Sequence, residues 1–195
     1  MTHSLSSLIG RALLAPLVRF WRDDSGVTAI EFGILATPFF AIIGAILETS
    51  VVFLAGAVLD SAVMDASRQI RTGQLQAQNY TITKFENLIC SKLYGLFKDC
   101  SELHIRVSTV HNFASATLAP PLATTCTTSC AWVLPVEFKP GQGSSTVIVQ
   151  VYYKWPLILR MGAFAANDQP DGTRLLGAVQ VFRNEPFSAS NIPAT

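Results

Sequence analysis

The residues best suited to chemistry lie at the start of the longest apolar stretch of the chain. Glu31 is one of only two charged residues between Val27 and Leu59, and Gly26 directly precedes that stretch. A carboxylate inside a membrane helix is costly, by about 2.5–3.5 kcal/mol at the centre on insertion scales. Cleavage after Gly26 would create an α-amino group on Val27, one helical turn from Glu31, and the two charges would attract strongly in an apolar medium. The spacing therefore gives Glu31 a partner that would offset its cost, provided that the chain is cut after Gly26.

No other residues form a catalytic constellation. His3 lies near the N-terminus, and His104 and His111 are expected to be satisfied surface histidines. Gly141-Gln142-Gly143 lacks the residues that complete a phosphate-binding loop and is better interpreted as a turn. The cysteines and histidines supply too few closely spaced ligands for zinc. We therefore expect no enzymatic activity, no metal and no cofactor.

The four cysteines, all of which follow the apolar stretch, predict disulfides in an oxidising compartment. Local pairs, Cys90 with Cys100 and Cys126 with Cys130, are the preferred interpretation among three possible connectivities. An unbroken helix between the first two would hold them too far apart, because a disulfide needs Cα atoms within about 7 Å. A helix that ends early at Gly95 would allow this pair. The second pair could form a small ring, or each thiol could bond elsewhere.

The apolar stretch itself is predicted to be a helix that crosses a membrane. Phe32–Leu47 contains no charged residue, and a bilayer core requires roughly 20 apolar residues in helical form. Pro38 is expected to loosen or kink the helix locally, with packing as its main role and a hinge as the alternative. Glu48 falls where the helix should emerge, so we expect an interfacial side chain that reaches water. A pairing role is the second interpretation of Glu48.

The charge distribution favours an N-terminus in the cytoplasm. The net charge of +1 provides no basic field, which argues against a nucleic-acid partner. Three arginines precede the span and two follow it: Arg11, Arg19, Arg22, Arg68 and Arg71. This weak positive-inside bias agrees with cysteines on the far side of the membrane. The expected location is a bacterial inner membrane, with the C-terminal domain in the periplasm.

Three segments are predicted: a leader over 1–26, a membrane-spanning and projecting helix over 27–73, and a periplasmic α+β domain over 74–195. An apolar stripe at helical spacing extends the helix beyond the membrane: Val52, Gly56, Leu59, Val63, Ala66 and Ile70. Either the rest of the chain or another subunit must cover this stripe.

The domain is expected to contain a short helix and a small antiparallel sheet. Thr83 and Glu86 have the spacing of a capping box for an amphipathic helix that ends near Lys98. Strands are predicted for residues 103–110, 132–138, 146–153 and 175–182. Residues 155–159 are apolar enough to form a buried loop or an exposed contact.

The order Gly26, Glu31-Phe32, Pro38 and Gly44–Glu48 resembles the TadE-like family of tight-adherence (Flp pilus) systems, which are type IV pilin-like proteins. A second segment resembles the C-terminal signature of that family: Arg183, Asn184, Glu185, Pro186 and Phe187. The resemblance implies a pilin-like fold and a minor pseudopilin that a prepilin peptidase cuts after Gly26. It also implies that Glu31 acts in subunit register or membrane extraction. Other pilins or pseudopilins, the pilus assembly platform and the lipid bilayer are the implied partners.

Two other functions stay open at the level of sequence. The chain could be an unprocessed, signal-anchored periplasmic domain that binds a ligand or mediates adhesion, with Glu31 merely near the headgroups. Its mature form would then keep Met1–Ser25, which N-terminal sequencing would detect. A membrane-tethered enzyme would need a site that these residues do not offer.

Overall fold

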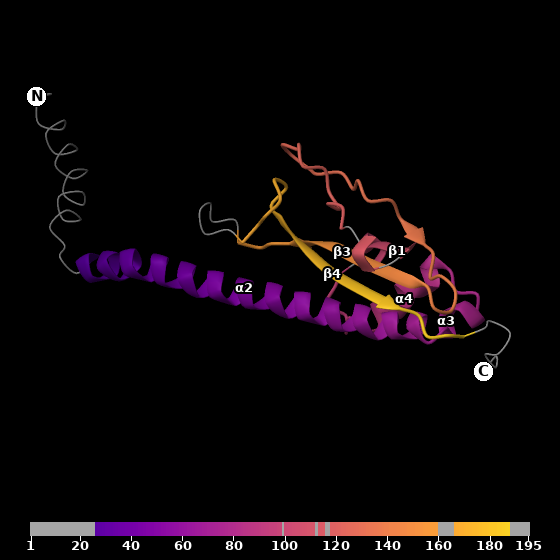
Figure 1. The fold of residues 1–195 in the computed structure, drawn as a ribbon. Helices are drawn as coiled ribbons and strands as arrows, with labels where there is room; N and C mark the ends of the chain where they lie inside the picture. The colour runs from indigo at the N-terminus through magenta and orange to yellow at the C-terminus, as the bar shows by residue number, and fades with distance from the viewer. Residues whose placement is uncertain (1–25, 99, 112, 116–117, 160–165, 188–195) are drawn as a thin grey trace, which may run out of the picture. The chain divides into compact units, whose positions relative to one another are not determined.

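A computed structural model describes residues 26–98, 100–111, 113–115, 118–159 and 166–187 of the chain (Figure 1). The predicted leader over residues 1–25, with His3 and the three arginines that precede the span, lies outside these residues. Close contacts divide the chain into two units, one ending at Gly44 and the other beginning at Ala45. The second unit therefore contains the later half of the long helix together with the α+β domain.

The first described helix, α2 (Val27–Arg71), is a single 45-residue helix. It ends two residues before the predicted end, because Gly73 has a φ of 80° in the left-handed region. Glycine adopts this conformation without steric cost, and it commonly follows the last turn of a helix. A short helix, α3 (Gln74–Ala77), comes directly afterwards.

The next helix, α4 (Ile82–Ser91), differs from its prediction at both ends. Thr81 is its cap, since its side chain accepts a hydrogen bond from the backbone N–H of Lys84 at 3.4 Å. The predicted cap at Thr83 is therefore wrong by two residues. The reason is that Thr81, directly before the helix, has the extended backbone conformation typical of a cap residue. At the other end, Tyr94 and Gly95 have positive φ and stop the helix before Lys98.

The sheet has four strands in the order β2-β1-β3-β4: β1 (His104–Val110), β2 (Glu137–Phe138), β3 (Thr146–Pro156) and β4 (Thr173–Arg183). β3 pairs antiparallel with β1 and with β4, whereas β1 and β2 are parallel. The sheet is therefore mixed, and the predicted all-antiparallel pairing is wrong at this edge. The long connection between β1 and β2 allows this, since parallel neighbours need a crossover of a dozen or more residues.

The predicted strand over 132–138 is also shorter than expected, with only its last two residues in β2. Trp132 instead forms an isolated bridge with Leu122. Two short 3-10 helices, Cys100–Glu102 and Phe113–Ser115, flank β1.

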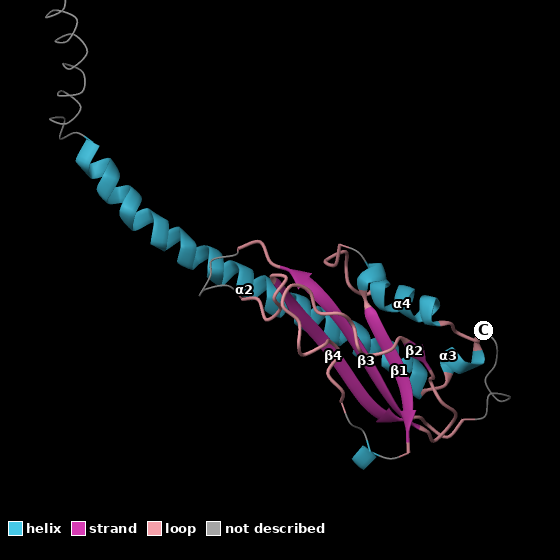
Figure 2. Ribbon diagram, turned by 90° about the horizontal axis from the view of Figure 1, so that it is seen from above, coloured by secondary structure: helices cyan, strands magenta, loops and turns pink. Residues whose placement is uncertain are grey.

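One face of the sheet and α4 pack on the later half of α2, which Figures 1 and 2 both show. Five of the six residues of the predicted stripe are buried, and Gly56 is half-buried. Three residues outside the predicted stripe are buried as well: Ala55, Ala62 and Ser67. The chain's own sheet and α4 therefore cover the stripe. Phe85 of α4 is fully buried in the same core, where its ring lies 5.3 Å from that of Phe138.

The opposite face of the sheet carries His104, whose location was predicted incorrectly from the sequence. His104 is buried, its ring stacks on Trp132 at 4.2 Å, and its Nε2 lies 2.5 Å from the backbone oxygen of Leu134. A satisfied histidine was predicted correctly, but the predicted surface location is wrong. The reason is that residues 132–134 cover this end of β1. His111 is exposed, as expected.

Candidate processing site and the contacts that hold the helix

The residues of the predicted cleavage site lie on the surface at the start of α2. Gly26 and Val27 are exposed, and the Phe32 ring is 69% exposed. A Cβ atom added to Gly26 would meet no atom within 4 Å. The fold of the described chain therefore does not require glycine at this position. A requirement for glycine would have to come from another molecule that acts on this bond.

Glu31 is placed to pair with an amino group at Val27. The helix begins at Val27, so the two residues stand in an i, i+4 relation on one helix face. The carboxylate of Glu31 is exposed and has no hydrogen-bond or ion-pair partner within the part of the chain that the structure describes. It is therefore available to an ammonium group of its own chain or of a neighbour.

The segment from Val27 to Leu47, with Glu31 as its one charged residue, has the length and surface of a membrane span. Val27–Leu47 comprises about 21 residues, which at about 1.5 Å per residue covers roughly the 30 Å of a bilayer core. α2 is thus long and apolar enough to cross a membrane. The helix is unbroken at Pro38, and the preceding Thr37 donates its hydroxyl to the backbone oxygen of Gly33 at 2.8 Å.

Glu48, the next charged residue, does more than reach water. Its Oε1 accepts hydrogen bonds from the backbone N–H groups of Ile158 (2.5 Å) and Leu159 (3.0 Å). The side chain therefore holds the segment after β3 against the helix. An isolated charge at the end of an apolar run indicated that Glu48 was unusual, but no sequence pattern identified its partners 110 residues away.

The C-terminal motif closes the other end of the helix–sheet unit. Asn184 is 3% exposed, and its Nδ2 donates to the backbone oxygens of Pro140 (2.9 Å) and Gln142 (3.0 Å). Its backbone N–H donates to the backbone oxygen of Ser145 at 2.8 Å. One asparagine thus fixes the loop between β2 and β3 to the end of β4.

The neighbours of Asn184 reach the last turn of α2. The backbone N–H of Glu185 donates to the backbone oxygen of Arg71 at 2.9 Å, and the two side chains form an exposed ion pair at 3.5 Å. Phe187 passes so close to Gly143 that a Cβ on this glycine would lie 2.3 Å from the Phe187 backbone oxygen. The motif therefore caps the helix and packs against a turn that only glycine can form.

Gln76, which the sequence analysis missed, completes this cap. Its Nε2 lies 3.2 Å from the backbone oxygen of Ile70 and 3.1 Å from that of Pro140. The residue follows the glycine that ends α2, but nothing in the local pattern indicates that its side chain turns back onto the helix. The amide of Gln76 therefore joins the last turn of α2 to the loop that contains Pro140, while the Ile70 oxygen also accepts from the backbone N–H of Gly73.

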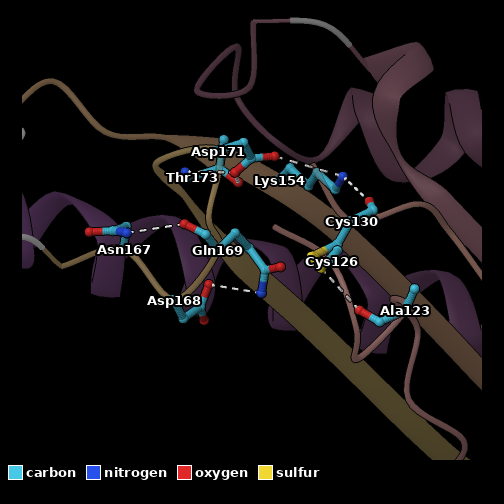
Figure 3. The surroundings of a disulfide bond; sticks show 9 residues. All are labelled: Ala123, Cys126, Cys130, Lys154, Asn167, Asp168, Gln169, Asp171 and Thr173. Atoms are coloured by element: carbon cyan, nitrogen blue, oxygen red, sulfur yellow. Dashed lines mark hydrogen bonds and ion pairs between the residues drawn. A yellow bond between two sulfur atoms is a disulfide. The ribbon is translucent and has the colours of Figure 1, made fainter. Parts of the chain in front are cut away.

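The cysteines form two local disulfides, Cys90–Cys100 and Cys126–Cys130. The early end of α4 makes the first possible, since the two Cα atoms lie 5.9 Å apart. Lys154 of β3 donates to the backbone oxygen of Cys130 at 2.6 Å and lies 3.9 Å from Asp171 (Figure 3). The second disulfide ring is therefore tied to the end of the β3–β4 pair.

Two carboxyl groups in the domain have lowered pKa values. The hydrogen bond from Lys139 is the main cause for Glu137, and Arg106 adds to it. For Asp171, burial raises the pKa, but the hydrogen bonds from Thr173 and the charge of Lys154 together bring it below its ordinary value. Both groups are therefore more stable as anions in the folded domain than in the unfolded chain.

We expect Asp171→Asn to lower the melting temperature near neutral pH, with little effect at low pH. A carboxyl group with a lowered pKa stabilises the fold fully above its unfolded value, about 3.9, and this contribution is lost as the pH falls through the folded value. The loss near pH 7 should be about 1 kcal/mol, roughly 2–4 °C. Thermal unfolding of the full chain in detergent at pH 7 and pH 3 measures it. Asp65→Asn, at an exposed ion pair, is the control, and an equal effect of Asp171→Asn at both pH values would contradict the prediction.

Comparison with known proteins gives a family match that covers Gly26 and most of α2. Residues 26–68 match a family model described as TadE-like protein. This match confirms the resemblance over a segment that includes Gly26, Glu31, Pro38 and Glu48, while the C-terminal motif lies outside it. Neither the curated proteins nor the solved structures give a match to this chain.

Proposed function

We propose that this chain, whose residues 26–68 match the TadE-like family, is a minor pseudopilin that supports the assembly of a Flp-type pilus. The family match over Gly26 and most of α2 is the observation that carries the proposal. In this role the protein is a substrate of a prepilin peptidase, which cuts after Gly26, and it is not itself an enzyme. The exposure of Gly26 and Val27 supports access of a peptidase to the bond.

Cleavage would change the electrostatics of the membrane segment. It replaces a neutral peptide group with an ammonium on Val27, at i, i+4 spacing from the Glu31 carboxylate. Opposite charges this close favour each other's ionised form, and the gain is larger where water is excluded. The pair can form within one chain or between neighbouring subunits, which gives Glu31 a role in register or in extraction from the bilayer.

The proposed orientation places the N-terminus in the cytoplasm and the domain in the periplasm. Two disulfides in the domain support an oxidising compartment. The side of α2 that faces away from the sheet also stays exposed beyond the span, with Met64 on its surface. This side is available to other pilins, pseudopilins or the assembly platform.

Cells with and without the prepilin peptidase test the proposal. In the presence of the peptidase we expect a smaller protein whose N-terminal sequence begins at Val27, and in its absence a protein that keeps residues 1–26. Mass spectrometry of the purified chain and its electrophoretic mobility both report this difference. Identical intact chains from the two strains would contradict the proposal and would favour an unprocessed, signal-anchored domain.

A further inference from the structure

Ile158 is the most exposed apolar side chain among the described residues of the domain. It is 90% exposed, whereas its neighbour Leu157 is buried in the core at 7%. The chain therefore turns sharply after β3, with one apolar residue fixed inward and the next directed outward. A single exposed isoleucine is common on the surface of soluble proteins, so exposure alone does not indicate a binding partner. The location of Ile158 relative to the membrane segment provides that evidence.

Glu48 fixes the location of Ile158 along the helix. The hydrogen bond between the Glu48 Oε1 and the Ile158 N–H, with that to Leu159, places this turn beside the first charged residue after the apolar run. The stretch from Val27 to Leu47 has the length of a bilayer core, so Glu48 marks the level at which α2 leaves the hydrocarbon. Ile158 lies at this level because its backbone is bonded to the Glu48 side chain.

The surface of α2 stays apolar for a short distance beyond Glu48. Val51, Phe53 and Leu54 are exposed, and the next charged residue is Asp60. The hydroxyl of Ser50 donates to the backbone oxygen of Ile46 at 2.7 Å, which satisfies it without water. An apolar helix surface of about 9 Å, from Glu48 to Leu54 at about 1.5 Å per residue, fits the headgroup and upper acyl region.

We infer that Ile158 is a second membrane contact, which inserts into the boundary between headgroups and acyl chains and holds the domain against the bilayer surface. The inference rests on the proposed membrane anchor. The lipid surface fits Ile158 because the residue stands at the level of the bilayer boundary, next to a helix surface that is itself apolar. Glu48 acts as the positioning residue, since it fixes the backbone that carries Ile158.

Spin labelling of the full chain in lipid vesicles tests this inference. All four cysteines are in disulfides, so a label attaches selectively to Ile158→Cys. The accessibility of the label to oxygen, which concentrates in lipid, is compared with its accessibility to a water-soluble nickel chelate. Ile42→Cys in the span is the lipid reference. Ser61→Cys, exposed and about 20 Å farther along α2 than Glu48 at about 1.5 Å per residue, is the water reference.

We expect an oxygen-to-nickel ratio at Ile158→Cys that is several-fold higher than at Ser61→Cys. Glu48→Ala in the Ile158→Cys background should lower this ratio, because the turn is no longer held at the boundary. A water-like label at position 158 with a lipid-like label at position 42 would overturn the inference and leave the anchor intact. Water-like labels at both positions would overturn the anchor as well. An immobilised label protected from both reagents would show a protein contact there and would also overturn the inference.

Discussion

Gly26→Ala is expected to abolish processing, so that the protein keeps residues 1–26 in cells that contain the peptidase. The substitution should not disturb the fold, because a Cβ at this position meets no atom within 4 Å. Any loss of cleavage must therefore arise in recognition by the peptidase. The measurement is the mass of the purified chain, and surface piliation should fall with processing. Normal cleavage of the alanine variant would contradict the predicted site.

Glu31→Gln is the matched contrast to this variant. Glutamine keeps the size and position of the side chain but carries no charge to pair with the Val27 ammonium. We expect this chain to be cleaved and yet to support piliation poorly, which separates processing from the later step. If piliation is unchanged in cells that carry Glu31→Gln, the proposed pairing role of Glu31 is wrong.

Asn184→Asp is expected to lower the free energy of unfolding by about 2–4 kcal/mol, since each unsatisfied buried polar group costs about 1–3 kcal/mol. The asparagine donates from one buried Nδ2 to the backbone oxygens of Pro140 and Gln142. Aspartate has the same shape but no N–H group, and its charge would face two carbonyl oxygens. Such a loss is a large part of the 5–15 kcal/mol that stabilises a typical domain. Chemical unfolding of the full chain in detergent, followed by near-ultraviolet circular dichroism, measures it.

Glu185→Gln, at the adjacent position, provides the control for this experiment. Its side chain forms an ion pair with Arg71 in which both partners are about half exposed. Exposed pairs of this kind contribute about 0–1 kcal/mol, and the backbone hydrogen bond from residue 185 to Arg71 is retained. Equal losses in the two variants would contradict the prediction that the buried amide of Asn184 contributes more to stability than the exposed ion pair of Glu185.

The sequence predicted the parts of the fold whose signal is periodic. The apolar stripe on α2 repeats at helical spacing over five turns, and the structure buries it. The alternation of Val147, Val149 and Val151 with their neighbours identified β3, although residues on both of its faces are buried. Burial on one side of the helix determines the first pattern, and β-branched residues at alternate positions indicate the second. A single sequence shows both directly.

The contacts that depend on distant residues could not be predicted. The parallel pairing of β2 depends on a long connection without regular spacing, and burial of His104 depends on a loop that passes over it. Glu48 and Asn184 both bind backbone atoms, which every residue possesses, so the residue types of their partners could not be used to predict these contacts. The N-terminal segment differs, because its residues are consecutive in the chain and the family match over residues 26–68 depends on them directly.

The hydrogen bond from Glu185 to Arg71 has a consequence for the order of folding. The last carbonyl of α2 acquires its protein donor only from a residue 114 positions later in the chain. Joining such remote segments carries a cost in loop-closure entropy and tends to slow folding. The tip of α2 would therefore remain open until the segment around Glu185 has been synthesised and has folded back, so a translation product that ends before residue 185 would lack this closure.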